Sequence, residues 1–343
     1  MKLKITNTAI AAALLTLLGH TAGAANAVGY NKITVPANSD VLVSVPFNED
    51  AAGTYSVSSI SSATISVNET LAADTFDNTY YVRITSGNAA GLWSTVSSNA
   101  AGELTVQDED ILSDVTAGDT LDVLPHHTLE TVLPDRLVDV SFIASTGSGF
   151  SLTINTTVRT WSADVGINQS PANTYYYHES GEWRTLAGGN ADATIFTPDD
   201  IMVIRNSDDT EALSYIVSGN VPEGAIGQLL STHASDDDTY TSSGRPVGIT
   251  LDELGLGGSA AFKGSTGSGF SLTINDTLRV YDNTTAGINK SPASTYYYHE
   301  TEGWRTLADA PAGDTVIPAG TGFVIRKVSG TTSTDAWTAQ APY

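Results

Sequence analysis

The sequence predicts an all-β fold of antiparallel β-sandwich or barrel-like modules in tandem, with very little helix. Apolar and polar residues alternate in short runs, as in Val41, Val43 and Val45, which is the period of a half-buried strand. β-branched and aromatic residues dominate these runs, as strands prefer. A segment of 11 residues also occurs twice, which indicates duplicated modules. Helices between the strands, which an α/β fold requires, are not indicated.

The duplicated segment, STGSGFSLTIN, occupies residues 145–155 and again residues 265–275. In its first copy Phe150, Leu152 and Ile154 alternate with polar residues, so we expect a strand with one apolar face. The match continues downstream, with one inserted residue, through the segments 166–168 and 287–289, 174–179 and 295–300, 183–187 and 304–308, and 203–205 and 324–326. Two modules that share one architecture are therefore predicted.

Local patterns predict four further elements. They are a strand at 158–161, a hairpin of 174–178 and 183–186, one or two helical turns at 250–256, and an exposed polar loop at 235–243. The hairpin is favoured because Gly181 in its loop can take a positive φ. The helical turn is favoured because Thr250 has an acidic residue three positions later, which is the pattern of a capping box.

A weaker third copy is expected upstream, where Tyr80 and Tyr81 precede Trp93, and residues 116–119 precede a Val/Leu strand. The predicted division of the chain follows from these matches. It consists of a signal peptide at 1–24, an N-terminal β module that is a divergent repeat at 25–135, a second β module at 136–223, a connector with the short helical turn at 224–258, and a third β module at 259–343.

The first 24 residues read as a secretory signal peptide. Lys2 and Lys4 precede the apolar run 9–18, and the small residues 22–24 (Ala-Gly-Ala) suit a cleavage site after Ala24, with Ala27 as the alternative. The apolar run is too short for a membrane span of about 20 residues, and no longer run follows it. We therefore expect an exported protein that is extracellular, on the cell surface or periplasmic, without a transmembrane span.

The composition and net charge limit the classes of partner that this protein can bind. The formal net charge is −23, from 38 acidic and 15 basic residues, so nucleic acid and anionic lipid are disfavoured as ligands. The chain has no cysteine, which excludes disulfides, thiol catalysis and thiolate metal ligands. Extracellular polysaccharide and other surface proteins are the partners that these properties leave, and the oligomeric state stays open.

Two sets of aromatic residues are the candidate binding residues. Exposed aromatic rings on one face of a strand stack on sugar rings, because the apolar face of a pyranose matches a flat π surface. The first set is Tyr175, Tyr177 and Trp183, and the second, at equivalent positions, is Tyr296, Tyr298 and Trp304. Two such platforms would reinforce each other on a polymer. The alternative, which is favoured, is that these rings fill the core.

Other chemistry-bearing residues give weaker signals. The pairs His178-Glu179 and His299-Glu300 occur at equivalent positions, which favours structural roles over a catalytic site. On a strand, His126 and His127 would face opposite ways and would not chelate one ion. The acidic pair Asp199-Asp200 is one of several and cannot be assigned to glycoside hydrolysis without geometry. No catalytic residue, cofactor or metal site is assigned. Structural calcium at 190–192 or 236–238 is left open, with solvated loops favoured.

The chain also resembles an uncharacterised family of secreted β-rich proteins from Verrucomicrobia-type bacteria. The resemblance covers most of the chain that follows the predicted signal peptide. It depends on the segments 28–30, 34–40, 90–93, 117–120 and 125–129, and on the later Trp-Arg and Val-Ile-Arg units. It implies export and a β-rich structure, and it brings no activity, cofactor or site residue.

Taken together, these features predict a secreted, non-enzymatic surface, matrix or assembly protein. The first alternative is a pair of carbohydrate-binding β modules that use the Tyr and Trp platforms. The second is a glycan-acting hydrolase that uses an acidic pair.

Overall fold

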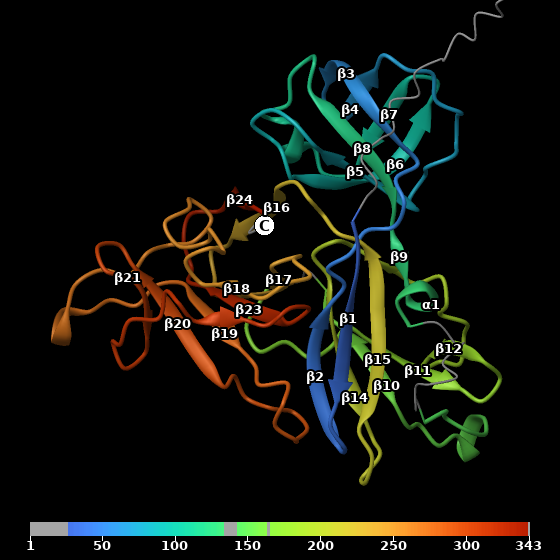
Figure 1. Ribbon diagram of the computed structural model, residues 1–343, viewed down its shortest axis with the longest axis vertical. Coiled ribbons are helices and arrows are strands. Elements are labelled where there is room, and N and C mark those ends of the chain that lie inside the picture. The colour runs from blue at the N-terminus through green and yellow to red at the C-terminus, as the bar shows by residue number, and fades with distance from the viewer. Residues whose placement is uncertain (1–26, 134–142, 163–164, 342–343) are drawn as a thin grey trace, which may run out of the picture.

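The protein is built almost entirely from antiparallel strands, which confirms the all-β prediction. The computed structural model describes residues 27–133, 143–162 and 165–341, so the predicted signal peptide lies outside the described residues. Within these residues the strands form one closed barrel and two larger units, each made of a five-stranded sheet with two-stranded ribbons (Figure 1). No helix in the described part of the chain is long and apolar enough to cross a membrane.

The barrel is the unit at the top of Figure 1. Its strands are β3 (Gly53–Ser61), β4 (Thr64–Val67), β5 (Tyr80–Ile84), β6 (Trp93–Ala100), β7 (Glu103–Val106) and β8 (Thr120–Pro125), closed in the order β3-β4-β7-β6-β5-β8, with the short 3-10 helix η1 (Glu109–Leu112). Alternate residues point inward, and Ile65, Val96 and Leu104 are fully buried there. Closure of the barrel leaves no unpaired strand edge.

The unit that we call the first sandwich has a five-stranded sheet covered by a ribbon. The sheet order is β12 (Glu182–Thr185), β11 (Asn173–His178), β10 (Thr157–Thr160), β14 (Ile201–Asn206) and β2 (Ser39–Ser44), and the ribbon pairs β1 (Val28–Val35) with β15 (Leu213–Asn220). The smaller elements are the pair β9 (His127–Thr128) and β13 (Ile195–Phe196), α1 (Leu129–Val132) and η2 (Gly149–Ser151). Val41 and Val43 of β2 point into the core between sheet and ribbon, as their alternation predicts.

The second sandwich has the same strand order. Its sheet runs β17 (Asp237–Ser242), β23 (Gly322–Lys327), β19 (Thr277–Val280), β20 (Ser294–His299) and β21 (Gly303–Thr306). Its ribbons pair β16 (Ile226–Thr232) with β24 (Ser333–Ala339), and β18 (Ile249–Thr250) with β22 (Val316–Ile317), and its short helix is η3 (Gly269–Ser271). Each element of one sandwich thus has a counterpart in the other, except that α1 corresponds to a hydrogen-bonded turn at 251–254.

The structure divides the chain differently from the sequence-based division. β1 and β2 pair with β15 and β14, so residues 28–44 belong to the first sandwich, and the barrel is inserted between β2 and β9. The prediction that residues 25–135 form a divergent copy of the later modules is therefore wrong. The barrel in this region is a closed sheet with another strand order. The second sandwich likewise begins at β16, inside the predicted connector at 224–258.

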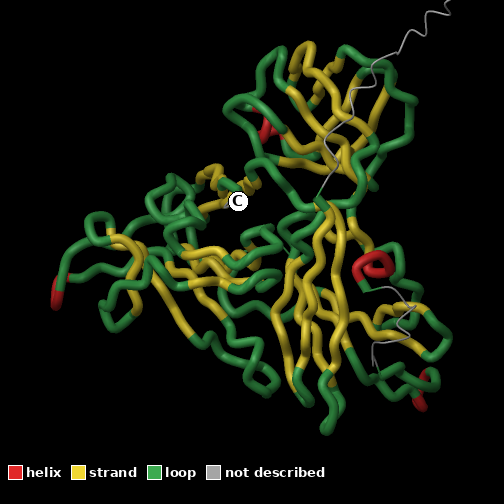
Figure 2. The backbone as a smooth tube through the Cα atoms, viewed as in Figure 1, coloured by secondary structure: helices red, strands yellow, loops and turns green. Residues whose placement is uncertain are grey.

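Of four local predictions, the exposed loop at 235–243 and the strand at Phe150 are wrong, and the hairpin and the capping box are confirmed. Residues 237–242, expected in an exposed loop, form β17 with Asp237 and Asp238 buried. Phe150 does not lie on a strand but in η2 (Figure 2). The hairpin of β11 and β12 is present, with Tyr177 opposite Trp183. The Thr250 capping box forms as well, and the backbone NH of Glu253 donates to Thr250 Oγ1 over 3.2 Å.

Candidate functional site

The aromatic residues predicted to bind sugar lie in the two cores. Trp183 is 1% exposed and Trp304 is 2% exposed, and Tyr175 and Tyr296 are also buried. Tyr177 and Tyr298 are partly buried and pack edge-on against these tryptophans, with ring centroids 5.5 and 5.6 Å apart. All six residues, Tyr175, Tyr177, Trp183, Tyr296, Tyr298 and Trp304, therefore serve packing. The platform interpretation fails for them because the ribbons cover that face of each sheet.

The most exposed aromatic residues in the described part of the chain are instead Phe150 and Phe270, one in each copy of the duplicated 11-residue segment. Both side chains are fully exposed, at 114% of the reference area. The six residues that were predicted to stack on sugar are all much less exposed. They lie in η2 and η3, which Figure 2 shows as red segments at the far right and far left ends of the paired sandwiches. We call the segments 145–155 and 265–275 the twin loops.

Glycines explain why the twin loops are not strands. Gly147 and Gly149 have φ values of +78° and +54°, a region that other residues rarely adopt. Thr146 and Thr153 form a β-bridge, and the chain between them makes one 3-10 turn. Ser151 Oγ closes this turn by donating to the Ser148 carbonyl over 2.9 Å. The alternation of Phe150, Leu152 and Ile154 is thus interrupted, and the phenyl ring is left at the tip.

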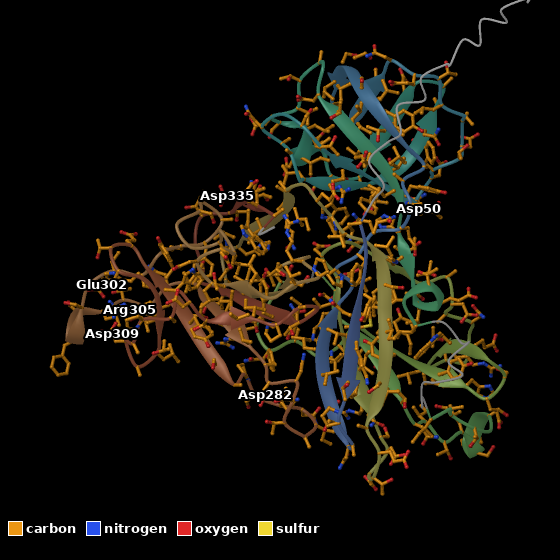
Figure 3. The ribbon with its side chains drawn as sticks, in the orientation of Figure 1. Asp50, Asp282, Glu302, Arg305, Asp309 and Asp335 are labelled. Carbon is orange, nitrogen blue, oxygen red and sulfur yellow. The ribbon has the colours of Figure 1, made fainter. Side chains whose placement is uncertain are left out.

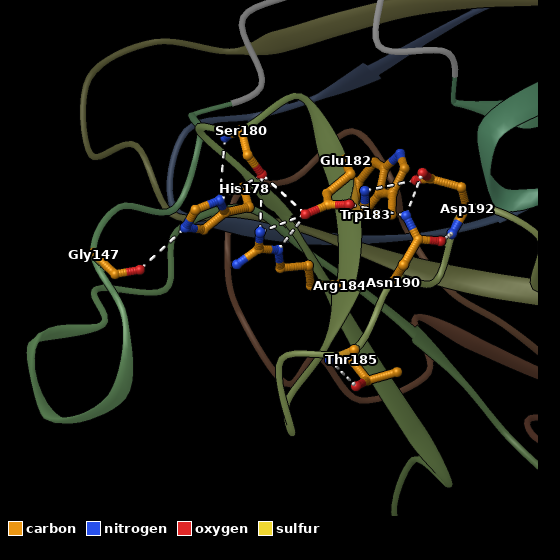
Figure 4. A network of polar contacts seen from close by, with 10 residues as sticks. Gly147, His178, Ser180, Glu182, Trp183, Arg184, Thr185, Asn190 and Asp192 are labelled. Carbon is orange, nitrogen blue, oxygen red and sulfur yellow. Dashed lines mark hydrogen bonds and ion pairs between the residues drawn. The ribbon is translucent and has the colours of Figure 1, made fainter.

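The strand that carries the aromatic run also anchors each loop. His178 Nε2 donates to the Gly147 carbonyl over 3.0 Å, and His299 Nε2 donates to the Gly267 carbonyl over 2.9 Å. Nδ1 of His178 accepts the backbone NH of Ser180, so both ring nitrogens have hydrogen-bond partners within the same sandwich. Figure 4 shows the contacts of His178 with Gly147 and Ser180. The duplicated histidines hold the loops, as a structural role predicts.

A second polar network beside this histidine belongs to the first sandwich only. Glu182 accepts hydrogen bonds from Asn190, Arg184 and Ser180, and these bonds lower its pKa to about 2 (Figure 4). Asp192 accepts the backbone NH of Trp183 over 2.7 Å. The residues considered for calcium at 190–192 therefore fix the β11–β12 hairpin, and the second sandwich has Gly303 in place of Glu182.

The two sandwiches hold each other by reciprocal contacts. In one direction, the backbone NH of Asn289 donates to Asp40 over 2.8 Å, and Asp40 pairs with Arg205 at 2.6 Å. In the other, the backbone NH of Asn168 donates to Asp238 over 2.7 Å, and Asp238 pairs with Arg326 at 2.6 Å. Each asparagine side chain also accepts from the other sandwich's arginine. Such exchange is what a twofold axis between the sandwiches produces, and it accounts for the repeated Gly-Ile-Asn segments.

Two cavities flank this junction, separated by Trp161 stacked on Tyr240 with centroids 4.6 Å apart and an angle of 14° between the planes. The first, of about 290 Å³, is lined by both sandwiches and includes Arg159, Tyr281 and Lys290; we call it the axial cavity. The second, of about 280 Å³, includes Asp199, Asp200 and His233; we call it the acidic cavity.

The acidic cavity contains an acidic pair that has no counterpart at the corresponding positions on the other side of the junction. Burial, together with the charge of Asp199, raises the pKa of Asp200 to about 7, and burial raises the pKa of Asp199 as well. On the other side, Gly320 and Thr321 take these positions, and Thr321 forms a β-bridge with Val43. Asp199 and Asp200 keep some solvent access, so they can exchange protons with water.

The remaining candidate residues have protein partners. His126 contacts Thr95 Oγ1 at 3.0 Å, whereas His127 contacts the Phe47 carbonyl and Glu49, so the two rings serve different elements. Burial, with the charge of His127, lowers the pKa of His126 to about 4. No group of three or more His, Asp or Glu in the described ranges is arranged to hold a metal ion. The acidic side chains are spread over all units, as Asp50, Asp282 and Asp335 illustrate (Figure 3).

No family model matches the chain, and neither the curated proteins nor the solved structures include a match. The resemblance to secreted bacterial proteins stays a prediction. The exposed phenylalanines were missed because their alternating neighbours suggested a strand, although the glycines at 147 and 149 were the available signal. The cavities had no sequence signal, since their walls come from residues far apart in the chain.

Proposed function

We propose that this is an exported, non-enzymatic matrix or surface protein that attaches at two points to a neutral polysaccharide through Phe150 and Phe270. The observation that carries the proposal is the exposure of both rings at the tips of identical loops. Burial of a phenylalanine side chain is worth about 1.5–3 kcal/mol, and neither ring contributes this to the fold. Packing therefore gives no reason for a phenylalanine at either tip.

The chemistry of the twin loops favours a sugar polymer. Each loop contains serine, threonine, glycine and asparagine around its phenylalanine and carries no charge. Hydroxyl and amide groups pair with sugar hydroxyls, and an aromatic ring stacks on the apolar face of a pyranose. The chain as a whole has a net charge of −23, which disfavours anionic surfaces. A neutral, hydroxyl-rich partner satisfies both properties.

The placement of the loops supports attachment at two points. They project from opposite ends of the paired sandwiches (Figure 2). When one loop is bound, the other is held at high effective concentration near the same polymer, so the combined affinity exceeds that of either loop. Two weak contacts then suffice for a matrix or assembly role.

The test is retention on an insoluble neutral polysaccharide, cellulose or chitin, by the wild type, Phe150→Ser, Phe270→Ser and the double variant. We expect each single variant to lose about tenfold or more in apparent affinity and the double variant to lose retention. Melting temperatures should stay unchanged because both rings are exposed. The matched control is Tyr30→Ser, which removes an aromatic ring that is 71% exposed but lies outside the loops.

Full retention of the double variant on both supports would contradict the proposal. Binding to neutral lipid vesicles in place of polysaccharide, lost in the double variant, would keep the loops as the attachment points and reject the sugar.

A second candidate function is glycan hydrolysis at the acidic cavity. It is favoured by Asp200, whose raised pKa of about 7 would keep a proton available for a leaving group near neutral pH. Turnover of any member of a glycan panel, abolished by Asp200→Asn, would support this candidate and overturn the non-enzymatic proposal.

A further inference from the structure

The axial cavity lies where the two sandwiches meet and receives corresponding residues from both. Trp161 and Tyr281 follow the equivalent strands β10 and β19, and Leu42 and Tyr240 lie at equivalent positions of β2 and β17. The cavity therefore straddles the approximate twofold axis and is built from both sandwiches together. Its volume of about 290 Å³ lies just below the range of about 300–1,000 Å³ for small-molecule sites, which suits one sugar-sized ring.

Aromatic side chains form much of its wall. Trp161 and Tyr240 are stacked on each other and both line the cavity, and Tyr281 adds a third ring. All three are only partly buried. Burial raises the pKa of Tyr240 to about 12 and raises the pKa of Tyr281, so both hydroxyls stay protonated and can donate hydrogen bonds. Such a wall accepts a ring that has apolar faces and polar edges.

The cavity is also a local excess of positive charge in an acidic protein. Its lining includes Arg159 and Lys290, and its one carboxylate, Asp40, is already paired with Arg205. Within the described residues no hydrogen bond occupies the Arg159 guanidinium, and burial lowers its pKa. Lys290 donates to the carbonyls of Asp282 and Thr285, which leaves one of its three protons for a ligand.

We infer that the axial cavity binds a hexuronate, a six-membered sugar ring that carries a carboxylate. The ring lies against Trp161 and Tyr281, and the carboxylate is bound by Arg159 and Lys290. Guanidinium and carboxylate form short, charge-assisted hydrogen bonds, which supply the affinity and the selection for an acidic sugar. The ligand is a free hexuronate or the terminal unit of an acidic polysaccharide. This site is independent of the twin loops.

The two sides of the junction differ in the residues that matter for this ligand. The position of Lys290 is taken by Gln169 in the first sandwich, and Gln169 lies in the same cavity. Arg159 has a counterpart in Arg279, whose side chain is also partly buried but does not line the cavity. The arginine pair provides matched variants that change the same residue type in equivalent strands, β10 and β19.

The test is calorimetric titration of the whole protein with glucuronate, and with glucose as the neutral probe. We expect glucuronate to bind and glucose to bind at least about tenfold more weakly. Arg159→Gln and Lys290→Gln should each weaken glucuronate binding about tenfold or more, whereas Arg279→Gln should leave it unchanged. Lys290→Gln is the second variant because it lies in a loop and makes this position identical to its counterpart. A tetramer of glucuronate distinguishes the sources, because tighter binding of the tetramer indicates a polysaccharide end.

Three results would overturn the inference. Equal binding of glucose and glucuronate would remove the role of the cations. An equal loss of affinity for glucuronate in Arg279→Gln and Arg159→Gln would show that glucuronate does not bind through the cavity lining. No heat of binding with glucuronate at millimolar concentration in the correctly folded wild type would show that the site is not one for a sugar acid.

Discussion

Asp40→Asn tests whether the reciprocal contacts hold the two sandwiches together. The Asp40 carboxylate accepts three hydrogen bonds, from Arg205 Nε at 2.6 Å, from Arg205 Nη2 at 2.7 Å and from the backbone NH of Asn289 at 2.8 Å. The side chains of Asp40 and Arg205 are 10% and 18% exposed. Asparagine has the same shape but no charge, so the arginine would be left largely buried without its counter-ion.

The magnitude follows from this geometry. Removal of one partner of a buried ion pair costs about 3–5 kcal/mol, and the remaining solvent access here reduces the figure. We expect Asp40→Asn to lower the free energy of unfolding by about 2–4 kcal/mol. Asp238→Asn, in the corresponding pair with Arg326, should cost a similar amount, since Asp238 accepts the same three kinds of hydrogen bond.

The assay is urea unfolding followed by tryptophan fluorescence, with the denaturant slope used to check that the transition stays comparable. The control is Asp209→Asn, an exposed acid on the loop after β14, for which a change below about 0.5 kcal/mol is expected. Asp40→Asn combined with Arg205→Met should recover part of the loss, because no unpaired charge is then buried. A loss below about 1 kcal/mol in both Asp40→Asn and Asp238→Asn would refute the reasoning.

The ion pair of Asp40 and Arg205 also makes the stability of the fold depend on pH in the acidic range. Burial by itself would raise the pKa of Asp40, but the hydrogen bonds from Arg205 and Asn289 outweigh it and the pKa is lowered from 3.8. The pair therefore stabilises the fold above pH 3.8, and the stabilisation is lost as the pH falls below that value. Asp40→Asn should flatten this acidic part of the stability profile.

Three further outcomes are expected. Trp183→Ala should cost about 3–5 kcal/mol in thermal or urea unfolding, since the ring is 1% exposed; an unchanged melting temperature would place the ring outside the core. Gly267→Ala should reduce retention on polysaccharide, because its Cβ would lie 2.2 Å from the Ser271 carbonyl oxygen, whereas Gly269→Ala meets nothing within 4 Å and should act more weakly. Asp200 binds its proton more tightly in the folded state, so stability should fall as pH rises from about 4 to about 7, and Asp200→Asn should remove about 1–2 kcal/mol of this fall in a pH series.

Short-range patterns predicted the local structure well. The alternation of Val41 and Val43 placed both side chains in the core, and the hairpin around Gly181 paired Tyr177 with Trp183. The match between residues 145–205 and 265–326 predicted two units of one architecture, and the sheets have one strand order. These elements are decided by residues close together in the chain, where turn chemistry and periodicity act directly.

Long-range pairing could not be read in the same way. β1 pairs with β15 about 180 residues later, and only Gly29, Thr34, Asp40 and Ser44 match the corresponding positions of β16 and β17. The acidic run at 236–238 suggested a solvated loop because its partners, Gly166, Asn168 and Arg326, come from distant segments. Burial of Asp237 and Asp238 depends on contacts that no local window contains.

Duplication argues against a unique active site only for residues that lie within one repeat. Each loop, core or strand of a repeated unit occurs twice, and the twin loops are the clearest case. A twofold axis between the units is different, because it passes through one place, and a cavity on it is built once from both copies. Residues there can diverge, as Gln169 and Lys290 have, without change to either core. We therefore propose two roles for the repeat: paired attachment at the tips, and one asymmetric site at the junction.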